Sequence, residues 1–148
     1  LNVGNGYMAL EDYENAESYF KKAIDVADDS SQQARASAYA NMGYCALEKE
    51  EYLRAIELFD LAERLYKDKS EQDFYNFSNI ESWRGRLYVE LAEYDRAMEH
   101  FLRAFEYAQE IQEYKQLSNV CKDIASLCAD LGEYKNAYEY QLLYSRME

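Results

Sequence analysis

Few side chains in this sequence could carry out catalysis. Its 148 residues contain one histidine, His100, and three cysteines, Cys45, Cys121 and Cys128. Any imidazole chemistry would therefore have to come from His100. The apolar periodicity around His100 turns it away from the apolar stripe of its segment, so we expect a surface histidine rather than a catalytic one.

The cysteines are expected in the core rather than in a metal site. Cys121 and Cys128 are seven residues apart on one helical face, but a closed zinc site needs four ligands and no histidine or third cysteine is near in sequence. Cys45 is expected to pack similarly, with somewhat greater exposure. No phosphate-binding loop, GxSxG or HExxH motif occurs. The sequence thus predicts no enzyme, no cofactor and no metal site.

The composition indicates an acidic, all-α protein. The sequence has 29 Asp and Glu against 16 Lys and Arg, a formal charge of −13, which disfavours direct binding to nucleic acid. It has no proline and five glycines, as expected for helices joined by few tight turns. No apolar run is long enough to span a membrane. An odd number of cysteines without a CxxC favours the reducing cytoplasm, with a periplasmic sensor domain as the alternative.

An internal repeat determines the expected architecture. The pattern Gly-x2-(Tyr/Ala)-x5-Tyr-x2-Ala-x3-Phe-x2-Ala begins at Gly4, Gly43 and Gly85, and a looser copy begins at Ala125, at intervals of 39, 42 and 40 residues. A small residue lets two helices approach closely, and the Ala-x3-Phe-x2-Ala residues, at positions i, i+4 and i+7, define the facing stripe. One helical hairpin cannot bury such a stripe alone, whereas stacked hairpins can.

These residues resemble the tetratricopeptide repeat (TPR) family. The period of about 40 exceeds the ~34 residues of the standard repeat, and is similar to the long-repeat branch found in kinesin light chain and in bacterial TPR regulators and sensor proteins. The resemblance implies an α-solenoid of four stacked helix-turn-helix repeats in one module, 1–148, with repeats at about 1–30, 33–69, 74–112 and 115–148. Because the first repeat lacks its opening residues and no polar capping helix follows the fourth, we expect this module to be excised from a longer protein.

Eight helices follow from the repeat, joined by short turns. Near 11–12, 50–51 and 93 the turns lack glycine, so less permissive residues must close them, whereas Gly132 closes the last one easily. We expect a true loop at 67–73. The repeat-column tyrosines are expected in the core: Tyr7, Tyr13, Tyr39, Tyr52, Tyr88, Tyr94 and Tyr134. The expected helices are 1–10, 13–28, 33–49, 52–68, 74–91, 94–112, 115–131 and 134–147.

The family resemblance implies a concave groove lined by the first helix of each repeat. Side-chain amides recur there and can both donate and accept, which suits an extended peptide backbone. Tyr44, on the side of its helix away from the packing stripe, and Arg86 are candidate anchors. We expect a nearly neutral groove, because Glu48, Glu90 and Asp130 offset its cations. The predicted partner-binding residues are Asn5, Asn41, Tyr44, Asn79, Ser82, Arg86, Asn119 and Lys122.

A more specific family function is not expected. Some chaperone-docking members hold a terminal carboxylate with a clamp of two Asn and three basic residues. Asn5 and Asn41 match the two Asn columns, but the basic columns hold Leu1, Asn79 and Trp83. Without these cations a terminal carboxylate has little to pair with.

Two functions remain open. The first is a non-catalytic scaffold that binds a protein or peptide in the groove. The second, suggested by the resemblance to segments that precede output domains, is a regulatory or sensory module of a bacterial sensor kinase or transcriptional regulator, controlling a domain outside this chain. An apolar patch at the last repeat, formed by Leu142, Leu143, Tyr144 and Met147, also predicts a possible homo-oligomer.

Overall fold

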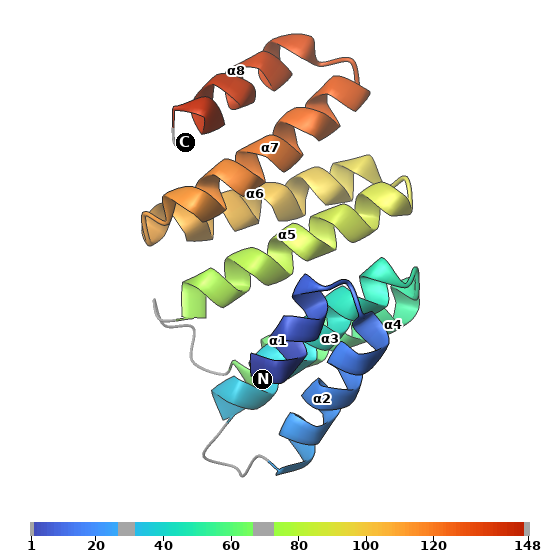
Figure 1. Ribbon diagram of the computed structural model, residues 1–148. Helices are drawn as coiled ribbons and strands as arrows, with labels where there is room; N and C mark the ends of the chain where they lie inside the picture. Colours follow the sequence, from blue (N-terminus) through green and yellow to red (C-terminus); the bar gives the residue numbers. More distant parts are fainter. Residues whose placement is uncertain (1, 27–31, 67–72, 147–148) are drawn as a thin grey trace. The chain divides into compact units, whose positions relative to one another are not determined.

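The protein is all-α. The computed structural model describes residues 2–26, 32–66 and 73–146, and this part of the chain contains eight α-helices and no strand (Figure 1). Every expected helix is present, with ends within three residues of those expected; the loop expected at 67–73 lies, except for Asp73, outside the described residues. The helices are α1 (Asn2–Ala9), α2 (Tyr13–Val26), α3 (Gln32–Glu48), α4 (Tyr52–Leu65), α5 (Phe74–Glu90), α6 (Tyr94–Glu110), α7 (Tyr114–Asp130) and α8 (Tyr134–Ser145).

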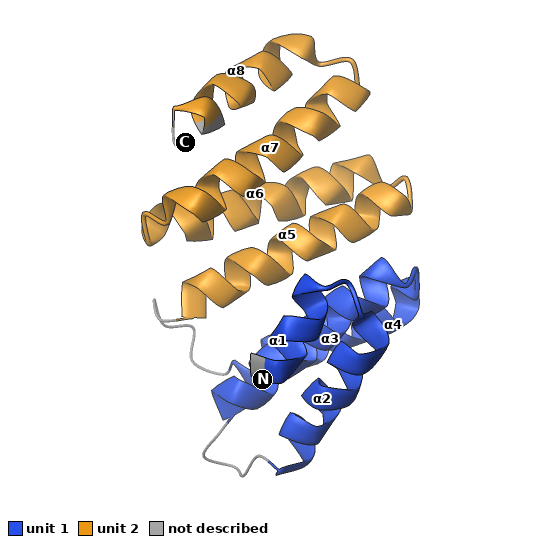
Figure 2. Ribbon diagram, in the orientation of Figure 1, with its two compact units in different colours: residues 1–69 blue, residues 70–148 orange. Residues whose placement is uncertain are grey.

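The helices form two compact units. Unit 1 is residues 1–69 and unit 2 is residues 70–148 (Figure 2). Each unit contains two helical hairpins, α1–α2 with α3–α4 and α5–α6 with α7–α8, and in each the second hairpin packs on the first. This is the stacking of helix-turn-helix repeats that the sequence predicts. None of the helices described here is long and apolar enough to cross a membrane.

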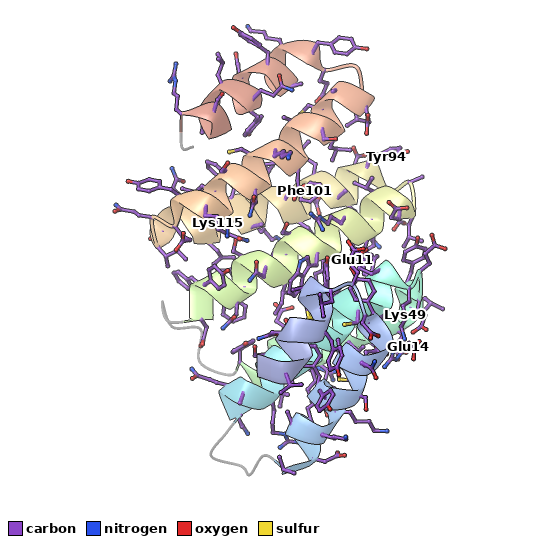
Figure 3. All side chains as sticks on the ribbon, in the orientation of Figure 1. Glu11, Glu14, Lys49, Tyr94, Phe101 and Lys115 are labelled. Carbon is purple, nitrogen blue, oxygen red and sulfur yellow. The ribbon has the colours of Figure 1, made fainter. Side chains whose placement is uncertain are left out.

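A glycine in the first helix of three hairpins lies directly on a phenylalanine ring of the second. The pairs are Gly4–Phe20, Gly43–Phe59 and Gly85–Phe101, each separated by 16 residues; Phe101 is labelled in Figure 3. A Cβ atom added at Gly4 would lie 2.7 Å from Cε1 of Phe20, and one at Gly43 2.6 Å from Cε1 of Phe59. Real Cβ atoms do not approach so closely, so only glycine allows these helices to meet over the ring.

The fourth hairpin replaces both partners. Ala125 occupies the glycine position and Gln141 the phenylalanine position. Ala125 is buried, but Gln141 is exposed. The looser fourth copy of the sequence pattern therefore has a physical counterpart in a hairpin that closes without the ring.

The predicted core is largely confirmed. The column alanines Ala16, Ala55 and Ala97 are fully buried and Ala137 is 6% exposed. Cys121 and Cys128 are buried as expected. Cys45 is also fully buried, so the greater exposure expected for it was wrong: it packs in the core of unit 1 beside Phe20 and Met42.

Two of the seven tyrosines expected in the core are on the surface. Tyr94 is 40% and Tyr134 72% exposed. In unit 1, the equivalent Tyr13 packs edge-to-face on Tyr44 of the following hairpin. The residue equivalent to Tyr44 after Tyr94 is Ser126, whose side chain is too short to cover a ring, and no further described hairpin follows Tyr134.

Non-glycine residues close most of the turns, as predicted. Glu11, Glu50 and Ala92 have φ angles of 60°, 63° and 58°, Gln112 has 52°, and Gly132 has 79°. In each turn the next N–H returns to a carbonyl of the preceding helix; Glu93 N, for example, donates to Tyr88 O at 2.9 Å. These hydrogen bonds satisfy carbonyl groups at the helix end and offset the cost of left-handed backbone at residues with a Cβ.

An ion-pair network joins the two hairpins of unit 1. Lys49 Nζ, at the end of α3, lies 3.2 Å from Glu14 and 2.7 Å from Glu17 of α2; Lys49 and Glu14 are labelled in Figure 3. Arg54 of α4 also pairs with Glu17, at 2.5 Å. Glu17 is only 11% exposed, so these pairs are screened less by solvent than ordinary surface pairs.

We expect Gly43→Ala to lower the free energy of unfolding by about 1–3 kcal/mol, because the new methyl group must displace Phe59. Gly6→Ala is the matched control, since a Cβ atom at Gly6 meets nothing within 4 Å. It should raise stability by about 0.5–1 kcal/mol through helix propensity. Urea unfolding followed by circular dichroism measures both changes. Equal effects at the two glycines would contradict the Gly–Phe account.

The turn residues allow a second test, in which one substitution introduces a glycine and the other removes one. Ala92→Gly should leave stability unchanged or raise it, because it removes the strain of left-handed backbone at an exposed alanine. Gly132→Ala should lower the free energy of unfolding by about 1 kcal/mol, although a Cβ atom there meets nothing within 4 Å. The same unfolding measurement distinguishes the two signs, and a loss of stability in both variants would argue against this explanation.

Candidate functional site

A polar hollow of about 380 Å³ lies between α5 and α7 in unit 2. Each helix contributes residues at positions i, i+3, i+4 and i+7, which a helical period of 3.6 places on one face. The two stripes occupy equivalent positions in successive repeats, exactly one interval of 40 residues apart. The lining consists of Asn79, Ser82, Trp83 and Arg86 from α5, and Asn119, Lys122, Asp123 and Ser126 from α7, with Gln116 one turn earlier.

The hollow brings together five of the eight predicted partner-binding residues. These are Asn79, Ser82, Arg86, Asn119 and Lys122. The other four lining residues, Trp83, Gln116, Asp123 and Ser126, are missing from the predicted set. The i+4 spacing from Asn79 and Asn119 would have found Trp83 and Asp123, since it completes the helical face that i+3 and i+7 define only in part.

Asp123 is the anionic group of the hollow. The Ser82 hydroxyl donates to its Oδ2 at 3.2 Å, and Arg86 Nε lies 3.9 Å from the same atom. Burial raises the pKa of Asp123, and the charge of Arg86 together with the Ser82 hydrogen bond offsets this only in part. Lys122 is exposed and makes no ion pair within the described part of the chain.

The carboxylates expected to offset the cations of the groove lie outside this hollow. Glu48, Glu90 and Asp130 are exposed, and none of them lines this hollow. Glu90 and Asp130 lie one helical turn beyond Arg86 and Ser126, where the helices end. The hollow therefore holds two cations, Arg86 and Lys122, against the single carboxylate of Asp123, in a chain whose formal charge is −13.

Buried hydrogen bonds support the floor of the hollow. Gln116 Nε2 donates to Ser78 Oγ at 3.1 Å, and Ser78 Oγ donates to the carbonyl oxygen of Ala104 at 2.8 Å. Gln116 is 6% exposed and Ser78 fully buried. These bonds join α7, α5 and α6, so the two lining stripes are held in register by the interior of the unit.

A second hollow, of about 280 Å³, adjoins the first. It shares Gln116 and Asn119 with the first hollow and adds Tyr75, Glu113 and Lys115; Lys115, labelled in Figure 3, stands near the start of α7. We call the two hollows together the α5–α7 groove. It follows both helices from their first turns to Arg86 and Ser126.

The remaining three predicted residues lie in unit 1. Asn41 Nδ2 donates to Asn5 Oδ1 at 3.3 Å, so these two amides bind one another. Tyr44 is half-buried, with its ring 6.0 Å from that of Tyr13 at an interplanar angle of 72°. Burial raises the pKa of Tyr13, as does the nearby Tyr44 hydroxyl. Tyr44 thus packs against Tyr13 of the preceding hairpin, whereas its neighbour Gly43 contacts Phe59 of α4.

Comparison with known proteins identifies the repeats. Two sequence profiles, both described as tetratricopeptide repeat, match residues 1–68 and 82–111. The chain belongs to the TPR family. Among curated protein sequences no match was found.

Solved structures support the TPR fold. The crystal structure of MamA matches with a TM-score of 0.70 and 18% identity, over 99% of this chain and 75% of that one. BtubC (BKLC) from P. vanneervenii matches with 0.77 and 14%, over 97% and 60%. The apo form of RapI matches with 0.63 and 15%, over 98% and 65%. At such identities the likeness concerns the fold alone, and this chain spans about 60–75% of their lengths.

The single histidine of this TPR chain was expected on the surface, but it is largely buried. His100 has a side chain only 13% exposed, with its Nδ1 2.5 Å from Oε2 of Glu81, and its ring stacks on Tyr88. Arg84 Nη1 pairs with the other oxygen of Glu81 at 3.0 Å. The expectation failed because Glu81, on another helix, gives His100 a partner between α5 and α6 that the local pattern around position 100 does not reveal.

The thiols are kept protonated by the TPR core. Burial raises the pKa of Cys45 to about 12 and that of Cys121 to about 11. A thiol rather than a thiolate is a poor nucleophile and a poor metal ligand. Among the residues with described positions, no group of three or more His, Cys, Asp or Glu is arranged to hold a metal ion.

The Glu81–His100 pair should make the stability of unit 2 depend on pH. Burial raises the pKa of Glu81, but the His100 hydrogen bond and the Arg84 charge outweigh it, so this pKa lies below its ordinary value of 4.5. Ionised Glu81 therefore stabilises the fold above about pH 4.5, and this contribution is lost as the pH falls through the lowered pKa. We expect Glu81→Gln to cost about 1–3 kcal/mol at pH 7 and progressively less below pH 4.5.

Urea unfolding at pH 7 and at several values below 4.5 measures this difference. Glu99→Gln, beside His100 but exposed, is the charge-matched control and should change stability by less than about 0.5 kcal/mol. A difference between the native protein and Glu81→Gln that does not shrink in acid would argue against the proposed role of Glu81.

Proposed function

We propose that this TPR chain is a protein-interaction scaffold whose α5–α7 groove binds an extended segment of a partner protein. TPR proteins bind protein partners and are generally non-catalytic scaffolds. The observation that carries the proposal is the pair of matching four-residue stripes that face one another across one groove. Residues at equivalent positions of successive repeats can contact successive parts of one extended ligand.

The chemistry of the stripes suits a peptide backbone. An extended segment presents an N–H donor and a C=O acceptor at every residue. Asn79 and Asn119 each offer both a donor and an acceptor to such groups. Trp83 and Arg86 belong to the residue types that contribute most to binding energy at protein interfaces. The groove thus combines hydrogen bonding that is independent of sequence with two anchor residues.

The lining of the groove is held in place by helices and buried hydrogen bonds. Every lining side chain except Glu113 stands within α5 or α7, and the buried Gln116–Ser78–Ala104 hydrogen bonds tie these helices together. A site carried by helices loses little conformational entropy when it binds. Hollows of about 380 and 280 Å³ match a few side chains of a peptide rather than a folded domain.

Unit 1 is the weaker candidate for the primary site. Asn5 and Asn41 bind one another and Tyr44 packs on Tyr13, so a ligand would have to displace existing contacts. We retain these three residues as secondary contacts in the proposal. A homo-oligomer formed through the last repeat also stays a prediction. Of the four residues of its expected apolar patch, Leu142 and Leu143 are 39% and 37% exposed, while the Tyr144 side chain and Met147 lie outside the described residues.

A displayed library of random peptides tests the groove. We expect the native protein to enrich binders whose affinity falls about tenfold or more in Asn79→Ala/Asn119→Ala, because two hydrogen-bonding side chains are lost. The control Gln109→Ala/Asn136→Ala removes two exposed amides outside the groove and should keep the same binders. Circular dichroism checks that helicity is unchanged. Peptides that bind the groove variant as well as the native protein would refute the assignment.

A further inference from the structure

We infer that the segment bound in the α5–α7 groove carries an internal acidic residue, whose side-chain carboxylate lies between Arg86 and Lys122. The inference rests on the proposed function and specifies its ligand. It follows from the unused hydrogen-bonding and charge capacity of three side chains that line the first hollow: Arg86, Lys122 and Asp123.

Arg86 and Lys122 have cationic groups available to a ligand. The Arg86 side chain is 48% exposed, and its ion pair with Asp123, at 3.9 Å, is longer than a hydrogen bond. A guanidinium group has five N–H donors in a fork that fits a carboxylate in bidentate fashion. Lys122, from the facing helix, adds an exposed ammonium group without an ion pair in the described structure. Two cations from two helices thus border one hollow.

The charge of the chain makes these cations selective. With a formal charge of −13, most of the surface repels acidic ligands. The first hollow is an exception, since its two cations exceed its one carboxylate. An acidic segment is therefore attracted to this hollow and repelled elsewhere, so its carboxylate fixes the register of the segment in the groove.

Asp123 favours a carboxylate over a phosphate group. Ser82 and Arg86 both contact its Oδ2 atom, which leaves Oδ1 able to accept an N–H from the ligand backbone. A single negative charge neutralises the net charge of the hollow. A phosphoserine carries about −1.5 to −2 at pH 7 and would place excess negative charge beside Asp123. The ligand class is thus an unphosphorylated segment containing Asp or Glu.

Peptide pools with a fixed central residue test the inference. The probes are fluorescent, N-acetylated and C-amidated decapeptide pools with Glu, Gln, Lys or phosphoserine at the centre and other positions randomised. By fluorescence anisotropy at pH 7 we expect the Glu pool to bind about tenfold more tightly than the Gln pool, and the phosphoserine pool no more tightly than the Glu pool. The Lys pool should bind most weakly.

Variants assign the preference to named residues. Arg86→Gln/Lys122→Gln should reduce the Glu pool to the affinity of the Gln pool while changing the Gln pool itself less than about twofold. The control Lys135→Gln/Arg146→Gln removes the same two charges from exposed positions of the last hairpin and should keep the preference. Asp123→Asn should raise the affinity of the phosphoserine pool relative to the Glu pool. Because Arg86 and Lys122 are exposed, the double variant is expected to fold normally.

Each outcome decides between the two proposals. If all pools bind equally and Asn79→Ala/Asn119→Ala still abolishes binding, the groove function stands and the acidic ligand is refuted. A Glu preference that persists in Arg86→Gln/Lys122→Gln also refutes it. If no pool binds, the proposed function fails and this inference fails with it.

Discussion

In three of the four hairpins, direct contact between a glycine and a phenylalanine ring sets the distance between the two helices, and the orientation of α5 depends on it. On α5, Gly85 must face Phe101, so the helix can rotate very little about its axis. This orientation turns the buried face toward α6 and leaves the Asn79–Arg86 stripe facing α7. The position of the groove is thus a consequence of the packing in the core.

Most of the fold could be predicted from the sequence because the packing is periodic. Small residues, alanines and rings recur at fixed spacing, and three of the four hairpins repeat the same glycine–ring contact, so the local pattern contains the tertiary information. The errors occur where a residue depends on a neighbour that differs between repeats. Tyr13 and Tyr94 occupy the same column, but Tyr44 covers the first and Ser126 is too short to cover the second.

The site was predicted only in part, for related reasons. The family resemblance, carried over by helical register, placed Asn79, Arg86 and their equivalents on one face, and they do share a hollow. Register does not tell which residues pair across helices. It therefore missed the contact of Asp123 with Arg86 and the burial of His100 against Glu81, because both depend on a partner about 20–40 residues away. The net charge of the hollow was not predicted either, since it depends on which carboxylates line it.

The two units differ in how the polar side chains of their first helices are used. In unit 1, polar groups on the first helices contact one another, as in the Asn5–Asn41 pair, and Lys49 is fully engaged with Glu14 and Glu17. In unit 2, the interior bonds of Ser78 and Gln116 hold the helices, so the side chains above them need not do so. Because these buried hydrogen bonds join the helices, Arg86 and Lys122 are not needed for helix packing, as the proposed binding role requires.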